Sequence, residues 1–213
     1  MQINKMFKSD VISLEDLRTI VRNGEARNVI TEGDQLCINF DGEIVPYDVI
    51  GIDVDKAADE KIVHTITIQA HELIEEHPFS TKGNTEDNYI KFNKWEDSEI
   101  RAYLNSDEYA IRCSELDEYA IPVIKDNTDG KTTEDKFFLL SASEYDAQST
   151  PYPYYKDKPH RAAKHAKNDF NDFHFTRSAY GNGNFVWYIS GSGDMSYDLA
   201  TSALPCAPAC VIG

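Results

Sequence analysis

Residues 185–213 read FVWYISGSGDMSYDLATSALPCAPACVIG, and this stretch decides the fold because two ordered ends enclose an irregular middle. The aromatic and β-branched residues of FVWYIS predict a core strand, and CAPACVIG predicts a closing strand. Between them Gly, Ser, Asp and Tyr follow no period that indicates a helix or a strand. We expect residues 186–189 and 207–212 to hold this middle in one shape. Exposed side chains on such a framework are free for recognition, because backbone hydrogen bonds and core residues carry the stability.

The composition indicates one sizeable core and excludes two classes of partner. The chain has 213 residues, of which 41% are hydrophobic, and a chain of this length can bury a single core. There are 37 acidic and 21 basic residues, which give a formal charge of −16. A surface of that sign repels nucleic-acid phosphates and anionic lipids. We therefore expect no nucleic-acid partner and no membrane insertion.

Targeting and redox features are few. No apolar run approaches the roughly 18 residues that a membrane span needs, and MQINKMFKSDVISLEDL lacks the apolar region of a secretion signal. These features predict a protein made in the cytoplasm without a signal peptide, with virion association as a further option. Four cysteines are too few for a disulfide framework in a chain this long. Reduced, buried thiols are expected.

The N-terminal third predicts a helix followed by an antiparallel sheet. SLEDLRTIVRNG has apolar residues at helical spacing, with Ser13 as the N-cap and Gly24 as the stop. GDQLCINF and EIVPYDVIGIDVD predict two strands around a turn at Asp41 and Gly42. The β-branched run KIVHTITIQA predicts a third strand of the same sheet.

The middle of the chain predicts the two main helices. In NKWEDSEIRAYLNSDEY one helix face can hold Trp95, Ile100, Tyr103 and Leu104. A second helix is expected through SELDEYAIPVIKDN, with Ser114 as its N-cap and a stop or kink at the proline.

Several shorter segments complete the expected architecture. FFLLS predicts a buried strand, and SASEYDAQ predicts a helical turn capped by Ser141 or Ser143. The polar residues 75–91 and the long stretch 149–174 predict loops, and DNTDGKTTEDK predicts a hydrophilic turn. No internal repeat is evident. The pattern as a whole predicts an α+β fold.

Motifs that resemble metal or catalytic signatures fail on spacing. His71 and His77 in HELIEEH are six residues apart, whereas the zinc-protease signature places its two histidines at i and i+4 of a helix. DNTDG lacks the alternating oxygen ligands of a calcium loop, and SGSGD lacks the nucleophile-elbow frame. YGNGN lacks the strand and helix that flank a phosphate loop. No catalytic residue, metal ligand or cofactor is predicted.

Cys206 and Cys210 form the one arrangement of chemical interest. Two thiols brought together could bind Cu(I) or cycle as a dithiol. In an unbroken strand, positions four apart lie on the same face but more than about 10 Å from each other. Only a kink, which Pro208 could supply, would join them, so buried structural cysteines are the favoured interpretation.

Four segments together resemble a large, mostly uncharacterised family of bacterial and prophage proteins. WEDSEIRAYLNSDEY resembles that family's W-x-x-S-x-I-R-x-W-L-N motif, and residues 33–40 and 135–141 resemble its GDxIxF and DKxFLLS strands. VWYIS and CAPACVI stand where the family has a W-W-L-R-S-like strand and a closing VRPA strand. Ala207 departs from the arginine of VRPA. The resemblance covers roughly residues 33–213, and residues 1–32 are expected to form a helical lead-in packed on that body.

The resemblance implies a C-type-lectin-like fold of the formylglycine-generating-enzyme variety. Such a fold has small antiparallel sheets, two main helices and an irregular C-terminal binding face. The same scaffold occurs in the variable proteins of diversity-generating retroelements, where adenine-directed mutagenesis rewrites Asn codons near the 3′ end. Residues 178–206 would be the variable-type region here, with Trp95, Trp187, Ile189 and Val211 in the core. The expected ligand-binding residues are Ser178, Tyr180, Asn182, Asn184, Tyr188, Ser190, Asp194, Ser196, Tyr197, Asp198, Leu199, Ser202, Leu204 and Pro205.

The resemblance favours a binding protein over an enzyme. The expected function is receptor recognition by a phage or prophage protein whose C-terminal face contacts a protein or glycan on a target surface. Virion or homo-oligomer association would fit the same scaffold. Two alternatives stay open: a non-variable structural virion protein, and a copper or thiol oxidase acting through Cys206 and Cys210. A loop rich in Ser, Gly, Asp and Tyr is also ordinary loop composition.

Overall fold

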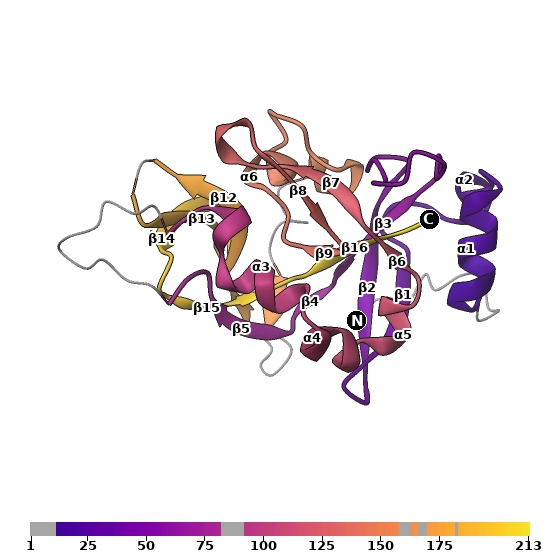
Figure 1. Ribbon diagram of the computed structural model, residues 1–213, viewed down its shortest axis with the longest axis horizontal. Helices are drawn as coiled ribbons and strands as arrows, with labels where there is room; N and C mark the ends of the chain where they lie inside the picture. Colours follow the sequence, from indigo (N-terminus) through magenta and orange to yellow (C-terminus); the bar gives the residue numbers. More distant parts are fainter. Residues whose placement is uncertain (1–11, 82–91, 158–162, 166–169, 182) are drawn as a thin grey trace.

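The computed structural model describes residues 12–81, 92–157, 163–165, 170–181 and 183–213. The fold is α+β, as predicted: antiparallel sheets dominate and the helices are short. A six-stranded sheet occupies the centre, the helices α1 (Leu14–Arg22) and α2 (Ala26–Val29) lie at one end, and a three-stranded sheet lies at the other (Figure 1). The finer likeness to a C-type-lectin-like fold stays a prediction.

The predicted closing strand, β16 (Ala209–Ile212), is confirmed and lies in the middle of the large sheet. All four of its residues are buried, which agrees with a short, continuous apolar run. It is antiparallel to β3 (Ile66–Ala70) along one edge, and to β6 (Ala120–Ile121) and β9 (Phe137–Phe138) along the other. Strand β16 therefore joins three segments that come earlier in the chain.

The predicted hairpin of the large sheet is also confirmed. Strands β1 (Gln35–Phe40) and β2 (Glu43–Ile52) pair antiparallel, and β2 pairs with β3. Asp41 and Gly42 have φ angles of 54° and 86°, the left-handed values that a type I′ hairpin turn requires. The third strand begins at Ile66, later than the start of the apolar pattern.

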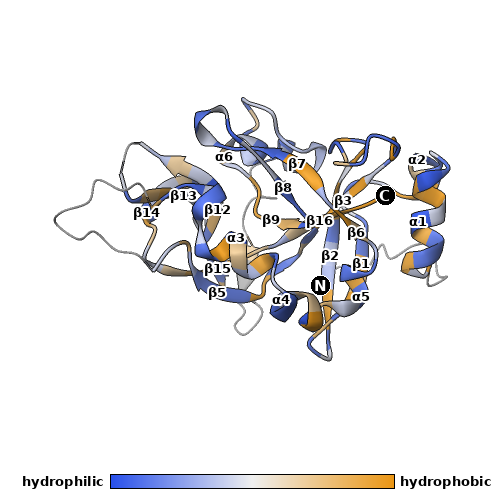
Figure 2. Cartoon of the chain, viewed as in Figure 1, coloured by the Kyte–Doolittle hydropathy of each residue, from blue (hydrophilic) through white to orange (hydrophobic). Residues whose placement is uncertain are grey.

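The N-terminal helix α1 forms as predicted and packs on the body. The Ser13 side chain accepts a hydrogen bond from the Asp16 backbone N–H, which satisfies one free amide at the helix start. Leu14, Leu17 and Val21 are buried against the core, and the orange stripe of α1 in Figure 2 marks this apolar side. The chain therefore begins its described part as an amphipathic helix.

The first predicted main helix is three short helices. Ser98 and Ser106 each accept a hydrogen bond from the backbone N–H three residues later. Serine side chains that bond the backbone in this way start new helices and interrupt old ones. Trp95, Ile100 and Leu104 are buried as expected, and Tyr103 is partly buried. The helices are η1 (Trp95–Asp97), α3 (Glu99–Leu104) and α4 (Asp107–Arg112).

The second predicted main helix is wrong beyond its first turn. Only α5 (Ser114–Asp117) is helical, and Cys113, not Ser114, is its N-cap. Pro122 disfavours a helical residue before it and cannot donate a hydrogen bond. The chain instead forms β6, which joins β16, and β7 (Val123–Asp126), which pairs with β8 (Thr132–Asp135). Thr132–Asp135, which were part of the predicted hydrophilic turn DNTDGKTTEDK, therefore form a strand.

The C-terminal segment is more ordered than the sequence predicts. Strand β13 (Phe185–Ile189) pairs with β12 (His174–Tyr180) as well as with β14 (Met195–Leu199). The prediction of an irregular middle is wrong at β14. The Ser190 N–H donates to the Asp194 carbonyl at 2.8 Å, and this turn folds the chain back onto β13.

The remaining elements are short. The capping box at Ser141 confirms the helical turn α6 (Ala142–Tyr145). The loop predicted for residues 75–91 is wrong at β5 (Glu75–Pro78), which pairs with β15 (Ala203–Cys206); residues 82–91 lie outside the described residues. No helix in the described residues is long and apolar enough to cross a membrane. The other elements are β4 (Glu72–Leu73), η2 (Thr128–Gly130), η3 (Pro153–Lys156), β10 (Ala163–His165) and β11 (Asn171–Asp172), with β10 parallel to β4.

Candidate functional site

Five large side chains gather on one face of the three-stranded sheet at the end of the molecule. The strand register places Tyr180 opposite Phe185, Trp187 opposite Tyr197, and Phe185 opposite Leu199. Directly opposed residues, and residues two apart in one strand, lie on the same side of a sheet. We call this set the aromatic face: Tyr180, Phe185, Trp187, Tyr197 and Leu199.

The rings of the aromatic face contact one another in a fixed pattern. The Tyr180 and Tyr197 rings stack in parallel with 3.8 Å between their centroids. Trp187 meets Tyr180 edge-on at 4.8 Å, and Phe185 meets Tyr197 edge-on at 5.5 Å. The neighbouring Tyr197 hydroxyl raises the pKa of Tyr180, whose phenol is protonated at neutral pH even at its usual value of about 10. The face thus combines apolar rings with hydroxyl groups that can hydrogen-bond.

The aromatic face is exposed, although its strands are anchored. The exposed fractions are 45% for Tyr197, 44% for Leu199 and 37% for Phe185. Val186, between Phe185 and Trp187, is buried on the opposite side. The buried Asn93 side chain donates hydrogen bonds to the carbonyls of Tyr180 and Phe185, at 3.4 and 2.9 Å. These contacts fix the backbone below side chains that reach solvent.

The predicted ligand-binding residues are only partly brought together. Pro205 was predicted as a ligand-binding residue, but it is buried, so that prediction is wrong. It lies in β15, which pairs with β5. Leu204 packs against the core, and Asn182 lies outside the described residues. Asp194, Tyr197 and Leu199 are exposed, and the others are partly buried: Ser178, Tyr180, Asn184, Tyr188, Ser190, Ser196, Asp198 and Ser202.

Two members of the aromatic face were not predicted as contact residues. Trp187 was expected in the core with Trp95, Ile189 and Val211, which are all buried. It is instead only partly buried, because it shares a face with the exposed Tyr197. Phe185 was not assigned to the site at all. The strand alternation, which puts Phe185 and Trp187 on one side and Val186 on the other, is the signal that would have found both.

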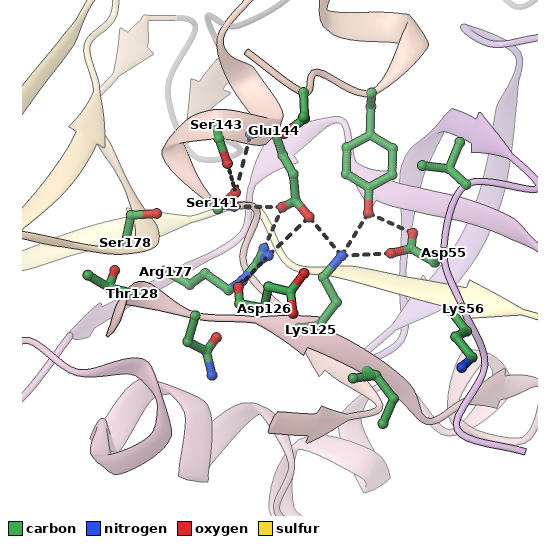
Figure 3. Close-up of a pocket in the computed structure, with 15 residues that line it drawn as sticks. Asp55, Lys56, Lys125, Asp126, Thr128, Ser141, Ser143, Glu144, Arg177 and Ser178 are labelled. Carbon is green, nitrogen blue, oxygen red and sulfur yellow. Dashed lines mark hydrogen bonds and ion pairs between the residues drawn. The ribbon is translucent and has the colours of Figure 1, made fainter. Parts of the chain in front are cut away.

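A second feature, which we call the polar pocket, is a cavity of about 500 Å³ between β7, α6 and β12. Figure 3 shows Lys125 between Asp55 and Glu144, with Thr128 and Ser178 at one end of the pocket and Lys56 at the other. Sequence reasoning missed this site, apart from Ser178. Its lining residues are Val54, Asp55, Lys56, Ile124, Lys125, Asp126, Asn127, Thr128, Ser141, Ser143, Glu144, Thr150, Tyr152, Arg177 and Ser178.

Lys125 is the centre of the buried charges beneath this pocket. Its side chain is only 3% exposed, and its Nζ lies 2.7 Å from Asp55 Oδ1 and 2.8 Å from Glu144 Oε1. The same Nζ donates a hydrogen bond to the Tyr152 hydroxyl at 3.0 Å. That hydroxyl in turn donates to Asp55 Oδ2 at 2.6 Å. A buried ammonium with three partners satisfies the requirement that buried charges be paired.

Arg177 makes a third buried ion pair, with Glu144. The guanidinium contacts both carboxylate oxygens of Glu144 and donates to the Asp126 and Leu139 carbonyls. Burial raises the pKa of Glu144, but the charges of Arg177 and Lys125 outweigh it and hold this pKa well below its usual value. Glu144 also accepts from the Ser141 N–H as part of the α6 capping box. The network therefore joins β7, α6 and β12.

Three of the four cysteines, Cys113, Cys206 and Cys210, are buried, as predicted, and carry free thiols. Cys37 is exposed, so the prediction of buried thiols is wrong there. Burial raises the pKa of Cys113 to about 12 and raises those of Cys206 and Cys210 as well. Protonated, buried thiols are poor nucleophiles and poor metal ligands. The favoured structural interpretation of Cys206 and Cys210 agrees with this environment.

The comparisons with known proteins return a family without an assigned function. No curated protein and no solved structure matches the chain. A family described as "Domain of unknown function (DUF6273)" matches residues 62–212, which is more than half of the 213 residues. The match runs from just before β3 to the end of β16. It includes the aromatic face and the polar pocket except for Val54, Asp55 and Lys56, which lie before it. The chain therefore belongs to the DUF6273 family.

Proposed function

We propose that this protein is a recognition module that binds a protein surface through its aromatic face. The observation that carries the proposal is the exposure of three large apolar side chains, Phe185, Tyr197 and Leu199, on one side of a hydrogen-bonded sheet. Contiguous apolar surface of this kind on a soluble protein marks interaction sites. Tyrosine and tryptophan dominate the binding energy of many interfaces.

The stacked rings reduce the cost of binding. Tyr180 and Tyr197 already hold each other in place at 3.8 Å, and Trp187 packs against the edge of Tyr180. Side chains that are ordered before binding lose less conformational entropy when a partner arrives. The face therefore suits a partner that supplies apolar side chains to a preformed, nearly rigid surface.

Charge favours a partner with basic groups. Asp194 is exposed in the turn before β14, and Asp198 is partly exposed within that strand. The whole chain carries a formal charge of −16, which attracts basic partners at long range and repels acidic ones. A protein surface with apolar anchors and surrounding lysine or arginine residues is the best match.

The proposal retains the phage or prophage origin and the retroelement-diversified surface that the resemblance implies. Tyr180, Tyr197 and Leu199 belong both to the aromatic face and to the positions expected to vary. Side chains that leave the sheet toward solvent can be exchanged at little cost to stability. We expect a near-copy of the codons for residues 178–206 beside a reverse-transcriptase gene in the source DNA. Sequencing that neighbourhood checks this part, and a neighbourhood without either element would contradict it.

Removing the exposed part of the face is expected to weaken binding by at least about 30-fold, which corresponds to a hot-spot loss of about 2 kcal/mol. The probe is a displayed random-peptide library selected on the full chain. Peptides that enrich are expected to carry aromatic and basic residues. Their affinities for Tyr197→Ala and Leu199→Ala are then measured by titration against the unmodified protein.

Ile111→Ala is the matched control, because Ile111 is an exposed aliphatic residue on α4, outside the aromatic face. It should leave the affinity unchanged. Enriched peptides that bind Tyr197→Ala as well as the unmodified protein would contradict the proposal. A library that yields no binders would also contradict it and would favour the alternative of a structural virion protein. The oxidase alternative gains no support from buried Cys206 and Cys210 thiols whose pKa values are raised.

A further inference from the structure

The polar pocket has a floor that cannot take up an anion. The three N–H donors of Lys125 go to Asp55, Glu144 and Tyr152. The five N–H donors of Arg177 match five contacts, two to Glu144 oxygens, two to the Asp126 carbonyl and one to the Leu139 carbonyl. A phosphate, sulfate or carboxylate would have to break a buried ion pair, which is strongly unfavourable.

The net charge of the pocket leads to the same conclusion. Its lining holds three cationic side chains, Lys56, Lys125 and Arg177, and these are balanced by three carboxylates, Asp55, Asp126 and Glu144. The formal charges therefore sum to zero, in a chain whose overall charge is −16. A neutral ligand enters such a site at a much lower desolvation cost than an ionised one, provided that its polar groups find hydrogen-bond partners.

Hydroxyl groups on the rim keep hydrogen-bonding capacity. Thr128 Oγ1 accepts from the Ala179 N–H at 3.1 Å, and Ser178 Oγ accepts from the Ala142 N–H at 3.0 Å. A hydroxyl that accepts from the backbone still has its own proton to donate. The Ser141 and Ser143 hydroxyls lie 2.9 Å apart on the same rim. This edge of the pocket therefore offers several donors and acceptors in close succession.

One acceptor in the lining is buried without a partner. Asn127 Nδ2 donates to Thr133 Oγ1 at 3.1 Å, but Asn127 Oδ1 has no hydrogen-bond partner among the described residues. A buried polar atom of this kind costs about 1–3 kcal/mol unless a water or a ligand satisfies it. This oxygen has almost no solvent-accessible surface, so it lies beneath the lining and is not itself a contact for a ligand in the pocket.

Two apolar side chains line the same cavity. Val54 and Ile124 are both exposed large hydrophobic residues. A ligand with an apolar face and a polar edge could cover them while its polar groups reach the hydroxyl rim. Pyranose and furanose rings have this shape, with C–H groups on one face and hydroxyls around the edge. A cavity of about 500 Å³ lies within the usual size range of small-molecule sites.

We propose that the polar pocket binds one neutral saccharide unit. Its hydroxyls would bond the Thr128, Ser143 and Ser178 side chains, and its C–H face would pack on Val54 and Ile124. The polar pocket is separate from the aromatic face. The saccharide proposal can therefore be tested independently of the proposed protein recognition. The ion network serves as a rigid, saturated floor.

The test uses saturation-transfer difference NMR on the full chain with a panel of unmodified hexoses and pentoses at millimolar concentration. At least one neutral sugar is expected to give a signal, and its 6-phosphate or 5-phosphate is expected to bind no better. Ser143→Tyr, at an exposed position of α6 in the pocket lining, should weaken that signal at least tenfold by filling the pocket. Ser114→Tyr is the matched control, because Ser114 is also an exposed serine in a short helix, and it should preserve the signal.

Three outcomes overturn the assignment. The first is the absence of a signal from every neutral sugar, and the second is tighter binding of the sugar phosphates, which would make the floor an anion site. The third is a signal that survives Ser143→Tyr but disappears in Tyr197→Ala, which would place the sugar on the aromatic face. A signal unchanged in Tyr197→Ala but lost in Ser143→Tyr supports the pocket, whatever the fate of the peptide experiment.

Discussion

Replacing Lys125 with methionine is expected to lower the free energy of unfolding by about 3–5 kcal/mol, the usual cost of removing one partner from a buried ion pair. Methionine matches the length of the lysine stem but leaves the Asp55 and Glu144 carboxylates without their shared cation. Tyr152 also loses a hydrogen bond from Nζ. Equilibrium urea denaturation followed by tryptophan fluorescence measures the loss, with Trp95 buried in the core as the main reporter.

Lys56→Met is the matched control for this experiment. Lys56 lines the same pocket, but its side chain is 74% exposed and its ion pair with Glu60 lies at the surface. Exposed ion pairs contribute about 0–1 kcal/mol, so the control should stay close to the unmodified protein. Equal losses in the two variants would show that burial does not strengthen the Lys125 contacts. A loss below about 1 kcal/mol for Lys125→Met would mean that the two carboxylates tolerate each other without it.

Lowering the pH from 7.5 to 5 is expected to cost the folded state about 2 kcal/mol through His174. This histidine is buried at the start of β12, and its Nδ1 has no partner in the described part of the chain. Burial lowers the pKa of His174 from 6.5 to about 4, partly offset by a hydrogen bond from the ring to the Asp172 backbone carbonyl and by the Asp172 charge. In the unfolded chain the same imidazole binds a proton at about pH 6.5.

The direction of the pH effect on stability follows from the folded and unfolded pKa values of His174. Above pH 6.5 the ring is neutral in both states and contributes nothing to the pH dependence. As the pH falls from 6.5 to 4, the imidazole is protonated in the unfolded state but stays neutral in the folded state. The free energy of unfolding therefore falls. Glu144 acts in a lower window, because its depressed pKa gives stability that is lost only as the pH drops below the unfolded carboxyl value. Between pH 5 and 7.5 the two effects are therefore separable.

His174→Gln should remove this loss, because an amide does not titrate. The measurement is the difference in unfolding free energy between pH 7.5 and pH 5, compared for the variant and the unmodified protein. His64→Gln is the control, since the His64 side chain is half-exposed beside Asp53. The loss of stability assigned to His174 should remain in this control. If His174→Gln loses as much stability at pH 5 as the unmodified protein, another group carries the acid sensitivity.

The elements that could be predicted from the sequence are those that depend on local chemistry. Asp41 and Gly42 supply the left-handed angles of a hairpin turn, and Ser13 supplies a cap three residues before the amide that it satisfies. Such signals lie within a few residues of each other. The C-terminal strand β16 was predicted for a similar reason, because a short apolar run bounded by proline and glycine has few other solutions.

The errors arise where distant segments compete with local preference. Residues 120–121 have an apolar spacing that suits a helix, yet they form β6 because β16 offers an open edge about 90 residues later in the chain. The strand β14 was missed because its Gly- and Ser-rich flank suggests a loop. Its sequence MSYDL does alternate between apolar and polar residues, which is the pattern of a half-exposed strand.

The two candidate sites show the same contrast between local patterns and contacts of distant segments. Tyr197 and Leu199 were predicted as exposed contact residues, and the structure exposes them. The polar pocket could not have been predicted, because Asp55, Lys125, Glu144 and Arg177 come from four separate segments and meet only in the folded chain. A single charged residue in a sequence carries no sign that it will be buried with a partner.

The central position of β16 has a consequence for synthesis on the ribosome. Strands β3, β6 and β9 leave the exit tunnel with edges that the later β16 covers in the folded chain. The nascent chain therefore carries open strand edges until residues 209–212 have emerged, and such edges invite wrong pairings. Strands β13 and β14 are made before β16. Whatever side chains they expose, they must still allow β16 to insert between β3 and the pair β6 and β9. The order of synthesis thus limits which side chains β13 and β14 can expose without blocking the insertion of β16.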